Sequence, residues 1–551
     1  MDRRGFVKGV GLAAASLGLA GAVADFAVPT AGARPAGVGG VRHGELSPKA
    51  GMYRAAVPEI FAPLPDAPEH VTAVVVGSGF GAAVAALRLA QAGTQVAVLE
   101  RGSRWPNSPN RDIFVEDTIP DGRGFWHRDV FTGMNRVPVP VDPFGGVLGV
   151  DSYPGMDVWR AAAVGGGSVV FTGVMIEPEK RFFDAVFRGV VSHDEMHSVH
   201  YPKARRSLRL SPMPEDVYRS RAFAHSRAWD QQVRQAGYTP QRVDGLWNWN
   251  VVRDELAGRS KPSATVGCSN LGNSNGAKFD LNQNYLRWAQ DTGKARVYPG
   301  HRVDAIGADG PGYAVRLSKL SPTGEVLRTR TIRCDKLFLG AGSVGTTELL
   351  VRARDAGTLR NLNEHVGAGW GTNGDVGLAR TLSTLDMGTQ GAPCASRILD
   401  ERDGMPVSLE NWFIPGVTAS DIGLLASLGI VLDNTRGRFV SRPDGSVTLL
   451  WPAGGNNDVE ARAMAVNRRA AGASGSVPPP ILEANATFTA HPLGGAVLGR
   501  AADAHGRVHG HKGLYVVDGA AVPGSTGTVN PSLTITALAE RNLAQIIRSG
   551  G

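Results

Sequence analysis

The segment Gly77-Ser78-Gly79-Phe80-Gly81-Ala82 determines how the chain is expected to fold. It follows an apolar, β-branched run at residues 71–76, typical of a buried parallel strand, and it opens a helical stretch that Gly93 terminates. A second strand is predicted over residues 95–99, and Glu100 ends it at the distance of about 20 residues that a dinucleotide-binding unit requires. The succession of strand, glycine turn, helix and strand therefore predicts an α/β protein of Rossmann-like type.

Each residue of this motif has a physical task. Gly77 permits the tight turn, Gly79 lets the backbone approach a pyrophosphate, and Ala82 lets helix and strand pack closely. The helix N-terminus offers amide donors and the positive end of the helix dipole to the phosphates. Glu100 can accept both hydroxyls of an adenosine ribose, which argues against a 2′-phosphate on the nucleotide.

Further nucleotide-like segments lie far along the chain, and they favour FAD over NAD. They are a second glycine turn at residues 163–168, a strand at 337–343 running into a helix at 344–353, a strand ending in acid and glycine at 514–519, and a helix at 533–547. An NAD enzyme would place a compact βαβαβ repeat next to the first motif. Widely separated segments that together build one nucleotide site predict FAD instead.

The composition indicates a turn-rich globular enzyme. Of 551 residues, 72 are glycine, well above the usual share of about 7%, which fits close approaches of the backbone to a ligand. The net charge of +8 comes without a long basic run, so nothing predicts nucleic-acid binding. Cys268, Cys334 and Cys394 are too far apart for a disulfide framework or a recognisable set of metal ligands, and we expect no metal.

Residues 1–33 have the features of an export signal. Arg3-Arg4-Gly5-Phe6-Val7-Lys8 precedes an apolar run that is too short and too rich in Gly and Ala to span a membrane. The paired arginines resemble a twin-arginine signal, so we expect a secreted protein. Small residues at 22–24 and 31–33 offer two cleavage points, and a basic N-terminal helix is the alternative interpretation. Residues 34–65, rich in Ala, Gly and Pro, are predicted to form a linker and an extended arm.

Over residues 71–548 the chain resembles the GMC (glucose–methanol–choline) oxidoreductases, and most closely their bacterial cholesterol oxidases with non-covalent flavin. The resemblance rests on residues 77–100, 164–178, 337–371, 491–498 and 514–542, of which 349–359 look most like the steroid oxidases. It implies a Rossmann-like FAD-binding domain made of residues 66–105, 277–365 and 505–551. It also implies a discontinuous α+β substrate-binding domain, residues 106–276 and 366–504, whose sheet covers the flavin.

The resemblance implies three catalytic residues. His491, in the turn His491-Pro492-Leu493-Gly494-Gly495, would hold the substrate hydroxyl and accept its proton, and Asn530 would orient that hydroxyl and stabilise reduced flavin. Glu410 matches the glutamate with which the steroid enzymes shift a ring double bond, and its apolar neighbours Phe413 and Ile414 would raise its pKa toward a usable value.

The resemblance also implies a set of residues in contact with FAD. No histidine lies at residues 164–173, near where the covalently linked relatives attach their flavin, so the cofactor is expected to be non-covalent. The implied contacts are Gly77, Gly79, Phe80, Gly81, Glu100, Gly167, Phe171, Val303, Asp518, Gly519, Asn530 and Ser532.

The implied activity is oxidation of the 3β-hydroxyl of a cholesterol-like sterol to the ketone, with hydride transfer to FAD. Oxygen would reoxidise the flavin to give hydrogen peroxide, and the 5-ene product would isomerise to the 4-en-3-one. We expect a monomer that touches a membrane or micelle only peripherally.

The chain departs from the close relatives at a few positions. Phe171 replaces a polar Asn, Ser532 replaces an aromatic residue, Ala496 replaces a Cys, and the loop at 525–529 is one residue longer. Two alternatives therefore stay open: a GMC oxidase or dehydrogenase for another bulky apolar alcohol, and a flavin-binding electron-transfer protein without alcohol chemistry.

Export is expected to depend on Arg3 and Arg4, because the twin-arginine signal is read by a receptor and not by charge alone. Substituting both residues with Lys should keep folded, yellow protein in the cytoplasm, as measured by flavin absorbance of the cell fractions. The matched control is Lys8→Arg, which keeps the charge and should not alter export. Continued export of the double variant would contradict the assignment of the signal.

Overall fold

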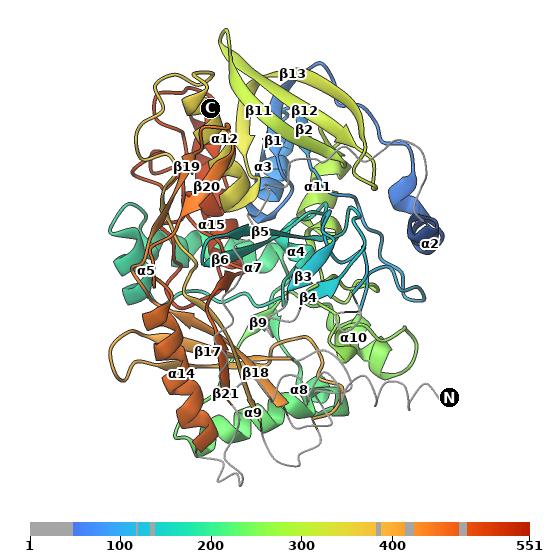
Figure 1. Cartoon of the computed structure of the whole chain (residues 1–551), viewed down its shortest axis with the longest axis vertical. Coiled ribbons are helices and arrows are strands. Elements are labelled where there is room, and N and C mark those ends of the chain that lie inside the picture. Colours follow the sequence, from blue (N-terminus) through green and yellow to red (C-terminus); the bar gives the residue numbers. More distant parts are fainter. Residues whose placement is uncertain are drawn as a thin grey trace.

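The computed structural model describes residues 48–116, 120–132, 138–381, 387–413, 424–472 and 482–550 (Figure 1). The expected export signal at residues 1–33 lies outside them. Two large sheets organise the described residues, one at each end of the longest axis of the molecule, with smaller elements between them. No helix in these ranges is long and apolar enough to cross a membrane.

The first sheet has seven strands, and its centre is parallel. The strands are β10 (Ala295–Tyr298), β2 (Val96–Leu99), β1 (His70–Val76), β13 (Val326–Leu339), β12 (Gly312–Leu320), β11 (His301–Asp309) and β23 (Leu514–Val516). β10, β2, β1, β13 and β23 run parallel, while β11 and β12 add an antiparallel extension to the N-terminal half of β13. The strands predicted at 71–76 and 95–99 lie in this sheet as β1 and β2. Those predicted at 337–343 and 514–519 also lie in it but end earlier, at Leu339 and Val516, so the prediction of an α/β nucleotide fold from distant segments is confirmed.

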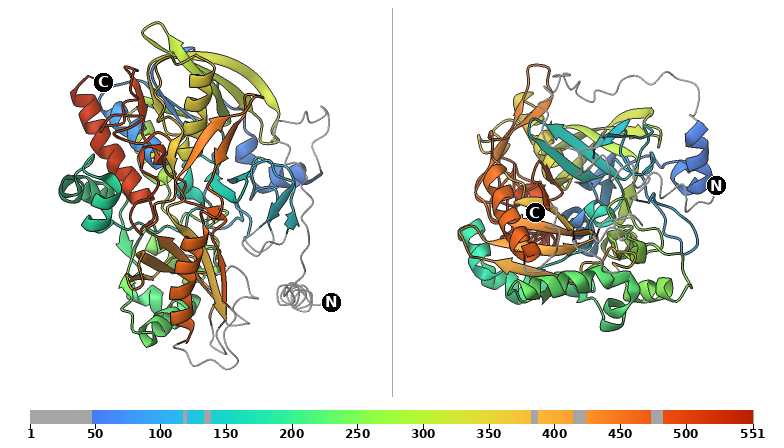
Figure 2. Two further views of the ribbon diagram at one scale, coloured as in Figure 1. Left: turned by 60° about the vertical axis from the view of Figure 1, so that its left-hand side comes forward. Right: turned by 60° about the horizontal axis from the view of Figure 1, so that its bottom comes forward.

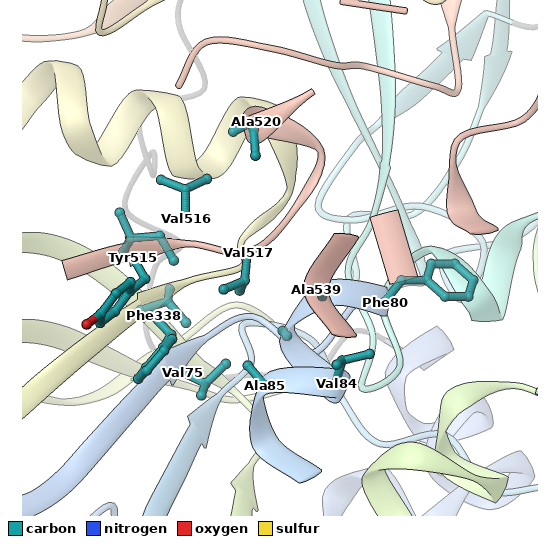
Figure 3. Close-up of a cluster of buried hydrophobic side chains, with 14 of the residues drawn as sticks. Val75, Phe80, Val84, Ala85, Phe338, Tyr515, Val516, Val517, Ala520 and Ala539 are labelled. Atoms are coloured by element: carbon teal, nitrogen blue, oxygen red, sulfur yellow. The ribbon is translucent and has the colours of Figure 1, made fainter. Parts of the chain in front are cut away.

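Long helices cover this sheet, and each follows a predicted strand. They are α3 (Phe80–Gln91), α12 (Gly342–Asp355) and α15 (Ser532–Arg548), with the shorter α11 (Tyr285–Asp291) beside α3. Figure 3 shows Val84 and Ala85 of α3, Phe338 of β13 and Ala539 of α15 in one cluster of buried hydrophobic side chains. The rings of Phe338 and Tyr515 stack with centroids 4.9 Å apart, which fixes β23 against β13.

Two glycines of the first motif are required by close approaches of the backbone. A Cβ on Gly81 would lie 1.6 Å from the carbonyl oxygen of Val517, so α3 meets the end of β23 only because no side chain is present. Gly77 has φ +87°, and a Cβ there would lie 2.3 Å from the carbonyl oxygen of Gly340. The glycine turn is therefore packed against both distant parts of the nucleotide fold.

The second sheet has six antiparallel strands. In order they are β21 (Leu482–Asn485), β15 (Asp375–Thr381), β18 (Leu424–Val431), β17 (Val407–Trp412), β16 (Ser396–Asp400) and β8 (Gln241–Arg242). Helices α9 (Ala224–Gln235) and α14 (Asn457–Gly472) lie against this sheet (Figures 1 and 2). They pack on one face of it, in a cluster of buried side chains that includes Trp229, Val376 and Leu409. The strands β17 and β18 are buried along nearly their whole length, so their other face is covered as well.

Shorter elements connect the two sheets and complete the described structure. They are α2 (Pro48–Ala56), η1 (Pro58–Phe61), β3 (Val130–Thr132), β4 (Pro138–Pro140), β5 (Leu148–Tyr153), β6 (Met156–Ala161), α4 (Gly167–Val170), α5 (Lys180–Phe187), α6 (His193–Glu195), η2 (Met196–His200), α7 (Tyr201–Ser207), β7 (Ser211–Pro212), α8 (Glu215–Arg219), η3 (Arg221–Phe223), β9 (Asp244–Gly245), α10 (Trp249–Leu256), η4 (Ala264–Val266), η5 (Leu281–Gln283), β14 (Ala368–Trp370), β19 (Gly437–Ser441), β20 (Val447–Leu450), β22 (Phe488–Thr489) and η6 (Gly519–Ala521). The positions of the domain boundaries stay a prediction.

The prediction of an extended arm up to residue 65 is wrong for residues 48–61. These residues form α2 and η1, and Tyr53, Val57 and Ile60 are buried against Phe144 and its neighbours. Pro48 and Pro58 each stand at the first position of a helix, where proline costs no hydrogen bond. The prolines that suggested an extended chain therefore begin helical segments here.

Gly81→Ala should lower the free energy of unfolding by about 3 kcal/mol or more, because the added methyl group must displace the backbone at Val517. Bound flavin should be lost together with stability, which absorbance at 450 nm and thermal melting would measure. Gly51→Ala is the matched control, since Gly51 lies in α2 with nothing within 4 Å of its added Cβ. That variant should change stability by less than about 1 kcal/mol. Similar effects of the two substitutions would contradict the packing argument.

Candidate active site

The first glycine turn is arranged to receive a phosphate. Gly79 precedes α3, and no side chain caps the free amides of the helix N-terminus. The nearest atom to a Cβ on Gly79 would be the Cα of Gly166, at 4.0 Å, so the turn is open on that side. A Cβ on Gly166, by contrast, would lie 2.5 Å from the Cα of Gly79. The second glycine turn thus touches the first, as expected for two parts of one cofactor site.

Ser78 and Glu100 join the two turns to the end of β2. The Ser78 hydroxyl donates to Oε2 of Glu100 at 2.6 Å and accepts from the amide of Gly165 at 3.0 Å. Oε1 of Glu100 accepts from the amide of Gly102 at 2.9 Å, and burial raises the pKa of this carboxyl. Each carboxylate oxygen still has acceptor capacity, so the residues fit the adenosine ribose that the sequence assigned to Glu100.

The side chain of Asp518 has a structural task that sequence reasoning did not predict. Its Oδ2 accepts from the amide of Gly342 at 2.8 Å and from the hydroxyl of Thr346 at 2.5 Å, and Oδ1 accepts from the amide of Ala520. Burial raises the pKa of Asp518 to about 6. The carboxylate fastens the start of α12 to η6, so a contact with FAD from this position would come from the backbone at residues 518 and 519.

The other predicted cofactor residues lie on several elements. Gly167 begins α4, and Phe171 follows it with its ring edge-on to Phe80, centroids 5.4 Å apart. Val303 lies on β11 at an irregularity of its pairing with β12, and the amide of His301 in the same strand donates to the carbonyl of Glu100 at 2.7 Å. Ser532 is the first residue of α15 and is buried. Their contact with FAD stays a prediction.

Next to this region, a rigid loop holds His491. The amide of Gly494 donates to the carbonyl of Gly519 at 2.8 Å, and Leu493 pairs with Gly371. Ala496, the departure noted in this block, is fully buried. The loop is thereby tied to η6 of the nucleotide fold, and the His491 side chain is only 13% exposed.

Asp375, at the start of β15, is the residue that sequence reasoning missed. Its carboxylate is fully buried, and Oδ1 lies 2.7 Å from Nδ1 of His491. Burial lowers the pKa of His491, but the charge and hydrogen bond of Asp375 and the charge of Glu410 outweigh it, so the pKa is raised overall. One sequence signal could have indicated this residue: Asp375 stands directly before the apolar residues of a strand. An acidic side chain at such a position is rarely buried unless it has a partner.

Glu410 and Asn530 meet directly, although 120 residues separate them along the chain. Nδ2 of Asn530 donates to Oε2 of Glu410 at 3.2 Å. Burial raises the pKa of Glu410 to about 7, although the hydrogen bond from Asn530 and the charges of His491 and Arg397 lower it. Oε1 of Glu410 and Oδ1 of Asn530 are buried and have no hydrogen-bond partner among the described residues. Two polar atoms thus point to a ligand that would satisfy them.

The loop before Asn530 is fixed from the second sheet. The side-chain amide of Asn373 donates to the carbonyl of Val529 at 2.9 Å, and its oxygen accepts from the amide of Thr526 at 2.9 Å. Thr528 in this loop has φ +64°, a conformation that a β-branched residue rarely adopts. The longer loop is therefore held in an unusual backbone conformation directly before a candidate catalytic residue.

Comparison with known proteins points to one family. A family model described as GMC oxidoreductase matches residues 456–539. A cholesterol oxidase of Mycobacterium tuberculosis is 28% identical over 548 residues, which cover 85% of this chain and 89% of the relative. A cholesterol oxidase of Acinetobacter baumannii is 27% identical over 548 residues, with 86% and 94% covered. The chain is therefore similar to the GMC oxidoreductases.

Solved structures show the same fold at low sequence identity. A fungal aryl-alcohol oxidase superposes with a TM-score of 0.59 at 14% identity, covering 88% of this chain and all of that chain. Pyridoxine 4-oxidase from Mesorbium loti superposes with a TM-score of 0.58 at 14% identity, covering 86% and 99%. GMC oxidoreductases are FAD-dependent, and the glycine turns and Glu100 of this chain fit the dinucleotide part of that cofactor.

Glu410 should make the protein less stable as the pH rises from about 4.5 to about 7. In that range the folded chain keeps a proton on Glu410 that the unfolded chain has released, so the free energy of unfolding falls with increasing pH. Glu410→Gln removes this loss of stability. At pH 8 the free energy of unfolding of the variant should exceed that of the wild type by at most about 3 kcal/mol. At pH 4.5 the two proteins should nearly match.

Thermal melting at the two pH values measures this difference. Glu364→Gln is the matched control, because the Glu364 side chain is 80% exposed and should show no pH-dependent gain. A Glu410→Gln variant whose melting temperature tracks the wild type at both pH values would show that Glu410 titrates normally.

Proposed function

We propose that this protein is a GMC oxidoreductase that oxidises the 3β-hydroxyl of a cholesterol-like sterol to the ketone. The observation that carries the proposal is that His491, Glu410 and Asn530 come together from three distant segments. Two of their buried oxygens, Oε1 of Glu410 and Oδ1 of Asn530, have no hydrogen-bond partner among the described residues. The names of the relatives from Mycobacterium tuberculosis and Acinetobacter baumannii support a sterol as the alcohol. Oxygen is the proposed acceptor, with hydrogen peroxide as product.

The roles of the residues follow from their chemistry. His491 would bind the substrate hydroxyl and take its proton, because Asp375 stabilises the imidazolium that results. Bound FAD supplies the acceptor for the hydride that leaves the same carbon. Asn530 stands one residue before Pro531, the N-cap residue of α15, whose N-terminus no side chain caps; Asn530 would orient the hydroxyl and, with the helix dipole, favour negative charge nearby.

An apolar cluster beside Glu410 suits a bulky hydrocarbon. Trp412 lies two residues after Glu410 on the same face of β17, and Leu428 pairs with Glu410 across β18. Both belong to one cluster of buried apolar side chains with Trp247 and Phe413. Ile414, which the sequence analysis placed in the same stretch, lies outside the described residues.

Glu410 is proposed to isomerise the 5-ene ketone to the 4-en-3-one. A carboxyl whose pKa is about 7 can both accept and return a proton at neutral pH, which moving a double bond between ring carbons requires. Its Oε1 is free of protein partners among the described residues, so it is the oxygen available for the transfer.

We further propose that FAD is bound without a covalent link and that the protein is exported. The first follows from the absence of histidine at residues 164–173, and acid precipitation should leave the yellow colour in the supernatant. A yellow pellet would contradict it. The second rests on the arginine pair at residues 3 and 4.

Two alternatives make different predictions. A GMC enzyme for another bulky apolar alcohol would keep His491 and Asn530 but would leave its flavin oxidised with every 3β-hydroxysterol. An electron-transfer flavoprotein would bind FAD that no alcohol reduces. Anaerobic flavin bleaching with a panel of sterols and other bulky alcohols separates the three.

The sharpest test separates His491 and Asn530 from Glu410. His491→Ala or Asn530→Ala should slow flavin reduction by about 10²- to 10⁴-fold, the range that general acid–base groups contribute. Glu410→Gln should leave flavin bleaching largely intact but stop at the unconjugated ketone, because Gln keeps the shape and cannot shuttle a proton.

The readouts are the rate of flavin bleaching and the ultraviolet absorbance of the conjugated enone. The exposed Glu364→Gln is the control and should change neither rate. Formation of the conjugated ketone at the wild-type rate by Glu410→Gln would show that Glu410 is not the isomerising residue.

A further inference from the structure

The carboxylate of Asp375 is surrounded by donors from a single short turn. Oδ2 accepts from the hydroxyl of Thr489 at 3.0 Å, from the amide of Ala490 at 3.0 Å and from the amide of His491 at 3.2 Å. Among the described residues, the hydrogen-bond partner of Oδ1 is the ring of His491, with Nδ1 at 2.7 Å. One oxygen thus fixes the backbone of the turn, and the other fixes the imidazole.

We propose that Asp375 is a positioning residue that holds His491 as the Nδ1–H tautomer, so that Nε2 is the atom that accepts the proton of the substrate hydroxyl. A carboxylate can only accept hydrogen bonds, and therefore Nδ1 must carry the hydrogen. This inference rests on the proposed function, in which His491 meets the hydroxyl of the alcohol.

The proton balance of the step is simple. The O–H bond of the alcohol breaks and the proton passes to Nε2, while the hydride leaves the carbinol carbon for FAD, so the alcohol loses two electrons as it becomes the ketone. The imidazolium that results carries one positive charge next to the negative charge of Asp375. The pair replaces a neutral imidazole beside a carboxylate, and burial strengthens the attraction.

The charged groups that face His491 decide between two possible bases. Asp375 approaches from β15 and Glu410 from β17, and Arg397 of β16 acts on Glu410. Oε2 of Glu410 already accepts a hydrogen bond from the side-chain amide of Asn530. Protonation turns neutral His491 into a cation, and the buried carboxylate of Asp375 in direct contact stabilises that cation, so the geometry favours His491 as the first proton acceptor.

Asp375→Asn tests the tautomer because an amide cannot reproduce this pattern. Two backbone amides, of Ala490 and His491, require an acceptor at the position of Oδ2. The Asn oxygen should take that place, which leaves its NH₂ group against Nδ1 of His491. Nδ1 must then accept, the hydrogen moves to Nε2, and the ring can no longer take the hydroxyl proton.

The experiment uses FAD-loaded protein with histidine-selective ¹⁵N labelling, and the His491→Gln spectrum assigns the signals. In the wild type Nδ1 of His491 should be protonated, and in Asp375→Asn the hydrogen should be on Nε2. Flavin reduction by cholesterol is measured across pH in a Glu410→Gln background, so that Glu410 does not titrate. Asp375→Asn should lower the maximum rate of flavin reduction by about 10²- to 10⁴-fold. It should also shift the acid limb, the pH range in which the rate falls as His491 becomes protonated, to lower pH, because it removes the anion that raises the pKa of His491.

Thr489→Val is the matched control. It removes a bond to the same carboxylate and the same turn but leaves the contact between Asp375 and Nδ1. It should keep the tautomer and the acid limb. Equal losses in both variants without a shifted acid limb, or an Nδ1–H signal that persists in Asp375→Asn, would overturn the inference. If Asp375→Asn fails to retain flavin, the wild-type tautomer decides: a hydrogen on Nε2 overturns the inference.

The positioning role of Asp375 and the proposed oxidation of a sterol can be contradicted separately. If the tautomer switches as expected but no alcohol reduces the wild-type flavin, the positioning role stands and the proposed function is wrong. If cholesterol reduces the flavin but Asp375→Asn changes neither the tautomer of His491 nor the pH profile, the function stands and the positioning role is wrong.

Discussion

The parallel pairing of β13 with both β1 and β23 is the constraint on which the rest of the structure depends. Val74 lies in register with Leu337, and Leu337 with Leu514, so three segments from the beginning, middle and end of the chain share one sheet. Because η6 and α15 follow β23, this pairing also positions Asn530. The hydrogen bond between Gly494 and Gly519 then brings the loop of His491 to the same place.

The active-site region combines the two sheets through one turn at the start of β15. Asn373 in this turn fixes the loop that leads to Asn530, and Asp375 fixes the loop that carries His491. β17 of the same sheet supplies Glu410. The spacing of the three candidate catalytic groups is therefore set by the second sheet, while their approach to the cofactor is set by the first.

Burial of acidic groups gives this site its chemistry and lowers its stability. Desolvation raises the pKa of Glu410 to about 7, which suits proton transfer at neutral pH but makes the ionised form unfavourable in the fold. Asp375 is also buried, but four donors surround its carboxylate. The two acids thus differ in role because they differ in hydrogen bonding, although both are buried.

The sequence by itself determined the nucleotide fold, because its signals are local: a glycine turn between an apolar strand and a helix, and apolar runs of the right length at 337–339 and 514–516. It also placed His491, Asn530 and Glu410 in separate motifs through resemblance. Only the tertiary structure brought Glu410 to Asn530 and Asp375 to His491, since no local pattern encodes a contact across more than 100 residues. The helix at 48–56 escaped prediction for a related reason: its stability comes from burying Tyr53 against a distant part of the chain.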